Sequence, residues 1–171
     1  MEENTIFNYL GLRARLTPQV VDIEDLYLDP ENPRLFGEDV EITPGELEGC
    51  HWSDPRAQWR LFRALEKSHG VQALIDSLAS LGYVPMDKMV VREALPGKFM
   101  LIEGNRRTVA MQRLLHDNMR RARKDPEEVL ATFRKIEVLV LTSTDADQAK
   151  DIFLLQGIRH IAGVRNWGPY Q

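Results

Sequence analysis

The stretch Gly104-Asn105-Arg106-Arg107 has the residue types of an anion-binding turn, because it follows an apolar run and begins a helix-like pattern. The first turn of a helix has N–H groups without intrahelical partners and a partial positive charge, so an anion can bind there. Glycine permits close backbone approach, and arginine supplies forked donors that match phosphate oxygens. With Thr108, which follows directly, these residues form a candidate phosphate-binding set.

Arginine at the start of a helix is otherwise unfavourable. A cation there opposes the helix dipole by roughly 0.3–1 kcal/mol. Either an anionic ligand or a neighbouring carboxylate, such as that of Glu103, should offset this cost. The sequence leaves two interpretations open: a ligand site, or a solvated helix face on which Glu103 pairs with an arginine.

Composition restricts the class of protein. The chain has 171 residues, 43% hydrophobic and 28% charged, which suits one globular domain. No apolar run is long enough to span a membrane, and the acidic start Met1-Glu2-Glu3-Asn4 does not resemble a signal peptide. The single cysteine, Cys50, excludes an internal disulfide and a cysteine-based zinc site. We expect a cytoplasmic protein without a membrane partner.

Charge is unevenly distributed along the chain. The formal net charge of −4 argues against a protein that binds nucleic acid with its whole surface, yet residues 106–124 contain seven Lys and Arg residues and one acid. The stretch from Val21 to Glu48 is strongly acidic. Four arginines of the basic stretch are candidates for contacts to a nucleic-acid backbone: Arg113, Arg120, Arg121 and Arg123. The alternative is a solvated helix end, where cations complement the dipole.

The first half of the chain predicts two well-marked helices. Asp54 can cap a helix that begins at Pro55 and ends at His69-Gly70, and the spacing of apolar residues predicts a second helix over 71–81, closed by Gly82. Before them we expect a short helix over 6–10, an edge strand over 20–28 and a loop over 35–53 with a helical turn after Pro44. Trp52 and Trp59 are expected in the core or under a loop.

The second half predicts a hairpin, a buried strand and further helices. Residues 89–91 and 99–102 are strand-like on either side of Leu95-Pro96-Gly97, a turn signal. A helix should follow Gly104 to about Arg123, and another should start at Asp125-Pro126. Residues 136–141 resemble a buried strand, and a last helix is expected over 144–158. The predicted fold class is α+β: a small mixed sheet with helices packed beside it.

Four segments, in order, resemble the N-terminal domain of the ParB/sulfiredoxin superfamily, also described as a ParB-like nuclease domain. They resemble the family's NP…R segment, its glycine–x–x–proline element before a strand, its GERR box and the place of its ENxxR box. In this chain the four segments are residues 28–34, 81–91, 102–110 and 156–160. The resemblance spans roughly residues 20 to 160 and implies a ParB/sulfiredoxin-like fold.

What the resemblance implies is a site for a nucleoside triphosphate, CTP or ATP, with magnesium. Gly104, Arg106 and Arg107 would hold phosphates, with Asn105 and Thr108 in the same box. Tyr83 and Pro85 would flank the nucleotide. Arg159 would reach the triphosphate from the last helix.

Departures from the family pattern affect metal binding and catalysis. Leu155 and Gln156 replace the acid and the asparagine that hold magnesium in the family. Gln156 and Glu103 are candidates for a metal ligand, with Asp87 and Asp151 as further alternatives, and Glu103 is the candidate catalytic residue. No cysteine lies beside the turn, so a sulfiredoxin-type reductase is not expected.

The leading hypothesis is therefore a nucleotide-binding regulatory domain of a DNA-associated protein. The alternatives are an enzyme on the same scaffold, either a nuclease or a CTPase-like NTPase, and a DNA-binding module without nucleotide. We expect an N-terminal arm over residues 1–19, the domain itself over 20–162 and the start of a following segment over 163–171 of a longer protein. Nucleotide, DNA and a second copy in a homodimer are the expected partners.

Overall fold

A single mixed sheet organises the part of the chain that the structure, a computed structural model, describes: residues 5–9, 12–30, 42, 44–68, 70–85 and 88–143. Its six strands lie in the order β1-β2-β6-β4-β5-β3. The strands are β1 (Thr5–Tyr9), β2 (Leu12–Asp22), β3 (Leu26–Tyr27), β4 (Met89–Leu95), β5 (Lys98–Glu103) and β6 (Lys135–Ser143). β3 runs parallel to β5 and β4 parallel to β6, while the other neighbours are antiparallel.

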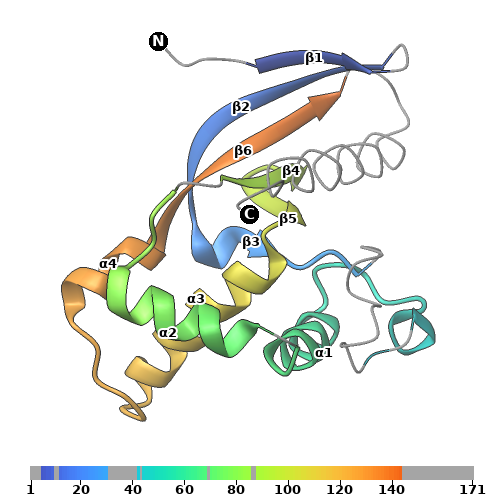
Figure 1. Cartoon of the computed structure of the whole chain (residues 1–171). Helices are drawn as coiled ribbons and strands as arrows, with labels where there is room; N and C mark the ends of the chain where they lie inside the picture. Colours follow the sequence, from blue (N-terminus) through green and yellow to red (C-terminus); the bar gives the residue numbers. More distant parts are fainter. Residues whose placement is uncertain are drawn as a thin grey trace, which may run out of the picture.

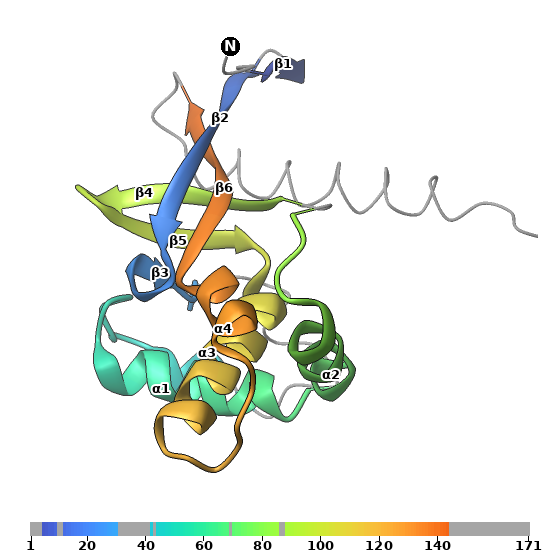
Figure 2. The same ribbon diagram turned by 90° about the vertical axis from the view of Figure 1, so that its left-hand side faces the viewer.

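Four α-helices in these ranges pack beside the sheet, so the predicted α+β class is confirmed. They are α1 (Pro55–Glu66), α2 (Val71–Leu81), α3 (Asn105–Met119) and α4 (Glu127–Arg134). Short 3-10 turns are η1 (Ile23–Asp25) and η3 (Pro44–Leu47). The helices gather at the end of the β2–β6 pair where Asp22 lies opposite Lys135, and β1 lies at the other end (Figures 1 and 2).

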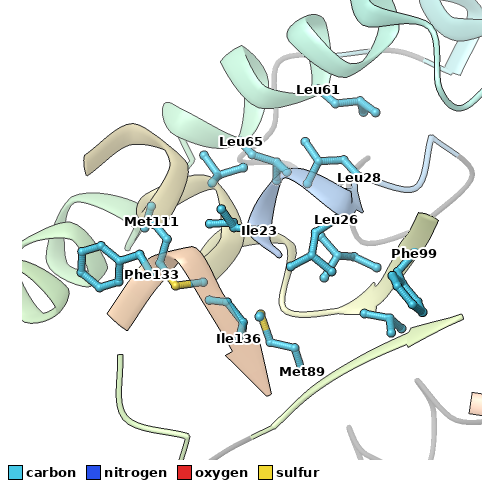
Figure 3. Close-up of a cluster of buried hydrophobic side chains, with 14 of the residues drawn as sticks. Ile23, Leu26, Leu28, Leu61, Leu65, Met89, Phe99, Met111, Phe133 and Ile136 are labelled. Atoms are coloured by element: carbon cyan, nitrogen blue, oxygen red, sulfur yellow. The ribbon is translucent and has the colours of Figure 1, made fainter. Parts of the chain in front are cut away.

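The main hydrophobic core lies between the helices and one face of the sheet. Met89 and Val91 of β4 point into it, together with Leu61 of α1 and Met111 of α3. Phe133 of α4 is fully buried in this cluster, where Figure 3 shows it. Because side chains alternate along a strand, a second, smaller cluster forms on the opposite face. Its buried members are Val90, Ile102 and Leu141.

The helix and hairpin predictions with the strongest local signals are confirmed. Asp54 caps α1 by accepting a hydrogen bond from the Arg56 N–H at 2.8 Å, and Pro55 is the first helical residue. α2 ends at Gly82, whose φ of +71° is left-handed. β4 and β5 form the expected hairpin, and β6 contains the predicted buried strand.

The prediction of a helix over 6–10 is wrong, because residues 6–9 lie in strand β1, which pairs with β2. β2 also continues the sheet from Leu12, so the boundary expected at residue 20 falls inside a strand. The strand expected over 20–28 is interrupted by η1. β1 pairs only with residues 12–16 of β2, so among the described strands residues 20–22 pair with β6 alone, and β3, after η1, lies at an edge of the sheet.

α3 ends earlier than predicted, at Met119 rather than Arg123. Arg121 has a φ of +59°, and the Ala122 N–H donates to the Asp117 carbonyl at 2.8 Å. This is a Schellman ending in which arginine takes the usual place of glycine. α4 also begins differently, since Pro126 is its N-cap and Asp125 is hydrogen-bonded to Asn118 instead of capping.

Several predictions concern residues outside the described ranges. These are the helix over 144–158, the segment 163–171 and the residues of the first family-like segment after Pro30. None of the helices in the described residues has the length and apolar character that crossing a membrane requires.

The expectation for Trp59 is wrong, since this side chain is 63% exposed on α1.

Candidate functional site

Gly104 forms the turn between β5 and α3 and is required there for two reasons. Its φ is +106°, a conformation that L-residues rarely adopt, and it is the N-cap of α3. A Cβ at this position would lie 2.4 Å from the Met89 Cγ and 2.9 Å from the Met89 Cβ. Met89 is itself buried at the start of β4. The turn is therefore pressed against the sheet, and its conformation is fixed.

Three strands bring polar side chains to the end of the sheet at which this turn lies. β4 is antiparallel to β5, so Lys88 precedes β4 where Glu103 ends β5. β6 is parallel to β4, with Met89 opposite Val138, and this register places Glu137 beside Lys88. Lys88 and Glu137 form an ion pair.

β3, which lies next to β5, finishes at the same end of the sheet. β3 runs parallel to β5 with Tyr27 opposite Met100, so Asp29, two residues after β3, lies at the end of the sheet where Glu103 ends β5. Asp29 is only 4% exposed. It also lines a cavity of about 830 Å³, together with Arg92 and Trp52. The residues that line this cavity do not include Tyr83 or residues 104–108, so the cavity is not part of the candidate phosphate site.

The side chains of the first turn of α3 are drawn toward the protein rather than fully into solvent. Arg106 and Arg107 are half-buried, and both take part in polar interactions. Asn105 is 8% exposed, and its Oδ1 has no hydrogen-bond partner in the structure as described. A half-turn of the amide exchanges its NH2 donor and its oxygen acceptor. This buried group can therefore either donate a hydrogen bond to a ligand or accept one from it.

Tyr83 enters the site from the loop after α2, held there by α4. Its backbone N–H donates to the Thr132 Oγ1 at 2.9 Å. The same hydroxyl oxygen would lie 3.0 Å from a Cβ on Gly82, so this glycine also allows a close approach. These contacts fix the backbone of Tyr83 to α4.

Burial raises the pKa of Tyr83 above its ordinary value of 10.0. The positive charge of Arg107 opposes this shift, and its guanidinium approaches the hydroxyl without being aligned for a full hydrogen bond. The charge of Glu137 raises the same pKa further, and that of Lys88 lowers it. At neutral pH, Tyr83 is a neutral hydroxyl that can donate a hydrogen bond.

This pKa provides a direct test of the contact between the two segments. Arg107→Met should raise the pKa of Tyr83 further, because the opposing positive charge is removed. Arg106→Met, the matched control, should leave it unchanged, because Arg106 is not among the groups that act on Tyr83. The pKa is measured from the near-ultraviolet absorbance difference between each protein and its Tyr83→Phe variant. Equal shifts in both variants would contradict the geometry.

The sign of the stability effect follows from the same shift. The folded protein holds the Tyr83 proton more tightly than the unfolded chain does. Its contribution to the free energy of unfolding is therefore fully present below pH 10.0 and is lost as the pH rises through the higher folded pKa.

The structure brings together most of the described candidates for nucleotide contact. Gly104 to Thr108 and Tyr83 meet at one sheet edge, Thr108 being fully buried with its hydroxyl 3.4 Å from the Met89 sulfur. Pro85 is exposed two residues beyond Tyr83. Arg159, Gln156, Asp87 and Asp151 lie outside the described residues. Glu103 is half-buried, and the described residues contain no cluster of three metal-ligating side chains.

The candidate arginines for nucleic-acid contact do not form one continuous basic surface. Arg113 pairs with Glu66 and with Asp117. Arg123 pairs with Asp125. Arg120 and Arg121 are exposed beyond the end of α3. Two of the four positive charges are therefore balanced by acids of the protein itself.

Three contributors to the site were not identified from the sequence: Lys88, Thr132 and Glu137. No local pattern marks them, because each is brought to the site by a neighbouring strand or helix. Searches of protein-family models, curated proteins and solved structures find no match to this chain.

Proposed function

We propose that the Gly-Asn-Arg-Arg turn (residues 104–107) binds the phosphates of a nucleoside triphosphate, in a ParB-like regulatory domain of a DNA-associated cytoplasmic protein. The observation that carries this proposal is the turn at Gly104, which has a φ of +106° and begins α3 directly before the half-buried Arg106 and Arg107. The charge of Arg107 also acts on Tyr83. Tyr83 belongs to the glycine–x–x–proline element and Arg107 to the GERR-like box. These are the two segments that the family resemblance assigns to one ligand.

The chemistry of the turn suits a phosphate in three ways. The first N–H groups of α3 point out of the helix with a partial positive charge. Arg106 and Arg107 stand at those positions and supply guanidinium donors. The buried Oδ1 of Asn105 has no hydrogen-bond partner among the described residues, and a half-turn of the side-chain amide would place the NH2 donor at that position instead. A phosphate would satisfy these groups together and offset the cost of placing two cations at a helix N-terminus.

The ParB-like assignment adds the remaining parts of the proposal. Arg159 would contact the triphosphate from beyond β6, and the base would lie near Tyr83 and Pro85. Magnesium would accompany the triphosphate. Glu103 is the candidate metal ligand among the described residues, which contain no cluster of three metal-ligating side chains.

A thermal-shift measurement tests the proposal. Each of the four ribonucleoside triphosphates is added with and without magnesium. A nucleotide at a hundred times its Kd adds about 2.7 kcal/mol of stability, or a rise in Tm of about 5–10 °C. Arg107→Ala should remove most of that rise. Arg120→Ala, which removes the same charge from the far end of α3, should keep it.

Two outcomes would redirect the proposal. No rise in Tm with any triphosphate would contradict nucleotide binding. Release of inorganic phosphate or cleavage of DNA in the same samples, lost in Glu103→Gln, would assign the phosphoryl-transfer alternative instead.

A further inference from the structure

α1 carries a basic face with an exposed aromatic ring at its centre. Arg56, Trp59, Arg60 and Arg63 occur at spacings of three and four residues, so they lie on one side of the helix. All four are exposed, Trp59 to 63%. The opposite side of α1 is buried in the core through Ala57, Leu61, Ala64 and Leu65. We refer to the four exposed residues as the α1 face.

Little of this positive charge is neutralised by contacts of the α1 face. Arg60 donates to the backbone carbonyl of Glu46 at 3.0 Å, a contact that leaves its charge in place. Arg63 pairs with Glu66 at 2.8 Å, but Glu66 also pairs with Arg113, so one carboxylate serves two guanidinium groups. The other acids near the face are Asp54, Glu46 and Glu48, which precede or border the helix.

Trp59 and Arg63 already form a stacked pair. The Arg63 guanidinium lies over the indole, 5.7 Å from its centre. Because 63% of the Trp59 side chain is exposed, the indole still offers surface on which another flat group can stack. Nucleic-acid bases stack on aromatic rings in this way, and nearby arginines contact the phosphates on either side.

We propose that the α1 face binds single-stranded nucleic acid, with a base stacked on Trp59 and backbone phosphates held by Arg56 and Arg60. The exposed ring favours a single strand, because an unpaired base presents its flat face and a base in a duplex does not. It also favours nucleic acid over an acidic peptide, which would match the charge but leave the indole in water. This surface is formed by α1 and does not include the first turn of α3.

Fluorescence anisotropy with a labelled oligothymidylate tests the proposal on the full chain. Trp59→Ala should weaken binding at least tenfold, whereas Trp59→Phe should retain most of the affinity, since a phenyl ring also stacks. Arg56→Ala with Arg60→Ala should weaken binding and reduce the slope of log K against log salt by about 1.4, or about 0.7 for each lost phosphate contact. The matched control, Lys124→Ala with Lys135→Ala, removes two exposed cations elsewhere and should change neither the slope nor the preference for a single strand over a duplex.

Three results would overturn this inference. They are an unchanged affinity in Trp59→Ala, equal binding of duplex and single strand, or equal competition by polyglutamate. Arg107→Ala separates the two sites: it should lose the nucleotide-dependent rise in Tm and still bind the oligonucleotide as the unmodified protein does.

Discussion

Replacing Gly104 with alanine is expected to destabilise the folded protein by about 3 kcal/mol, and two separate costs contribute. The first is the positive φ of +106°, which a side chain tolerates poorly. The second is the collision of the new Cβ with Met89, whose Cγ and Cβ lie 2.4 and 2.9 Å away. Met89 is buried, so it cannot move without disturbing the core.

Gly97→Ala is the matched control for this substitution. Gly97 also has a positive φ, +72°, but nothing lies within 4 Å of its Cβ position. Its replacement should therefore cost only the conformational part, about 1–2 kcal/mol. Urea denaturation of both variants measures the two values. If Gly104→Ala costs no more than Gly97→Ala, the turn is not pressed against β4 as described.

Phe133→Ala is the second substitution with a large expected effect, about 3–5 kcal/mol. Phe133 is fully buried and is the largest of the side chains with almost no exposure. α4 is only eight residues long, too short to be stable without its packing. Thr132 of the same helix accepts a hydrogen bond from the Tyr83 N–H. Losing α4 should therefore also lower the protection of this amide from hydrogen exchange.

Trp59→Ala is a useful comparison, because it removes a larger aromatic side chain from an exposed position. It should cost less than about 1 kcal/mol. Denaturation curves give both values, and amide hydrogen exchange at Tyr83 reports on the site. A small effect of Phe133→Ala, with unchanged exchange at Tyr83, would show that α4 does not support this edge of the protein.

The parts of the fold that were correctly predicted depend on local chemistry. The cap at Asp54, the apolar spacing over 71–81 and the turn at Gly97 all act within one or two turns of chain. The turn at Gly104 belongs to the same group, since a strand followed by glycine and a helical pattern defines it locally. Its role as a ligand site stays a prediction.

Most of the parts that were missed depend on distant pairing. Residues 12–16 alternate apolar and basic side chains, a strand pattern that the sequence interpretation missed. β1 pairs with these residues of β2, and β2 is held in the sheet by β6 far along the chain, as Leu16 pairs with Leu141. Arg113 was predicted to belong to a basic stripe along one helix. No feature of the sequence indicates that its side chain pairs with Glu66, because Glu66 lies on another helix, α1. Trp59 fitted the apolar pattern of α1, yet the helix turns it outward and buries Leu61 and Leu65 instead.

The most direct test of phosphate binding is a titration of ¹⁵N-labelled protein with CTP and with ATP, followed through its backbone amide resonances. We expect the largest changes at Asn105, Arg106 and Arg107, whose N–H groups begin α3, with smaller changes at Tyr83. The same titration of Arg107→Ala should require much more nucleotide. Resonances from 104 to 108 that stay fixed while others move, or that never move at all, would contradict the proposed role of this turn.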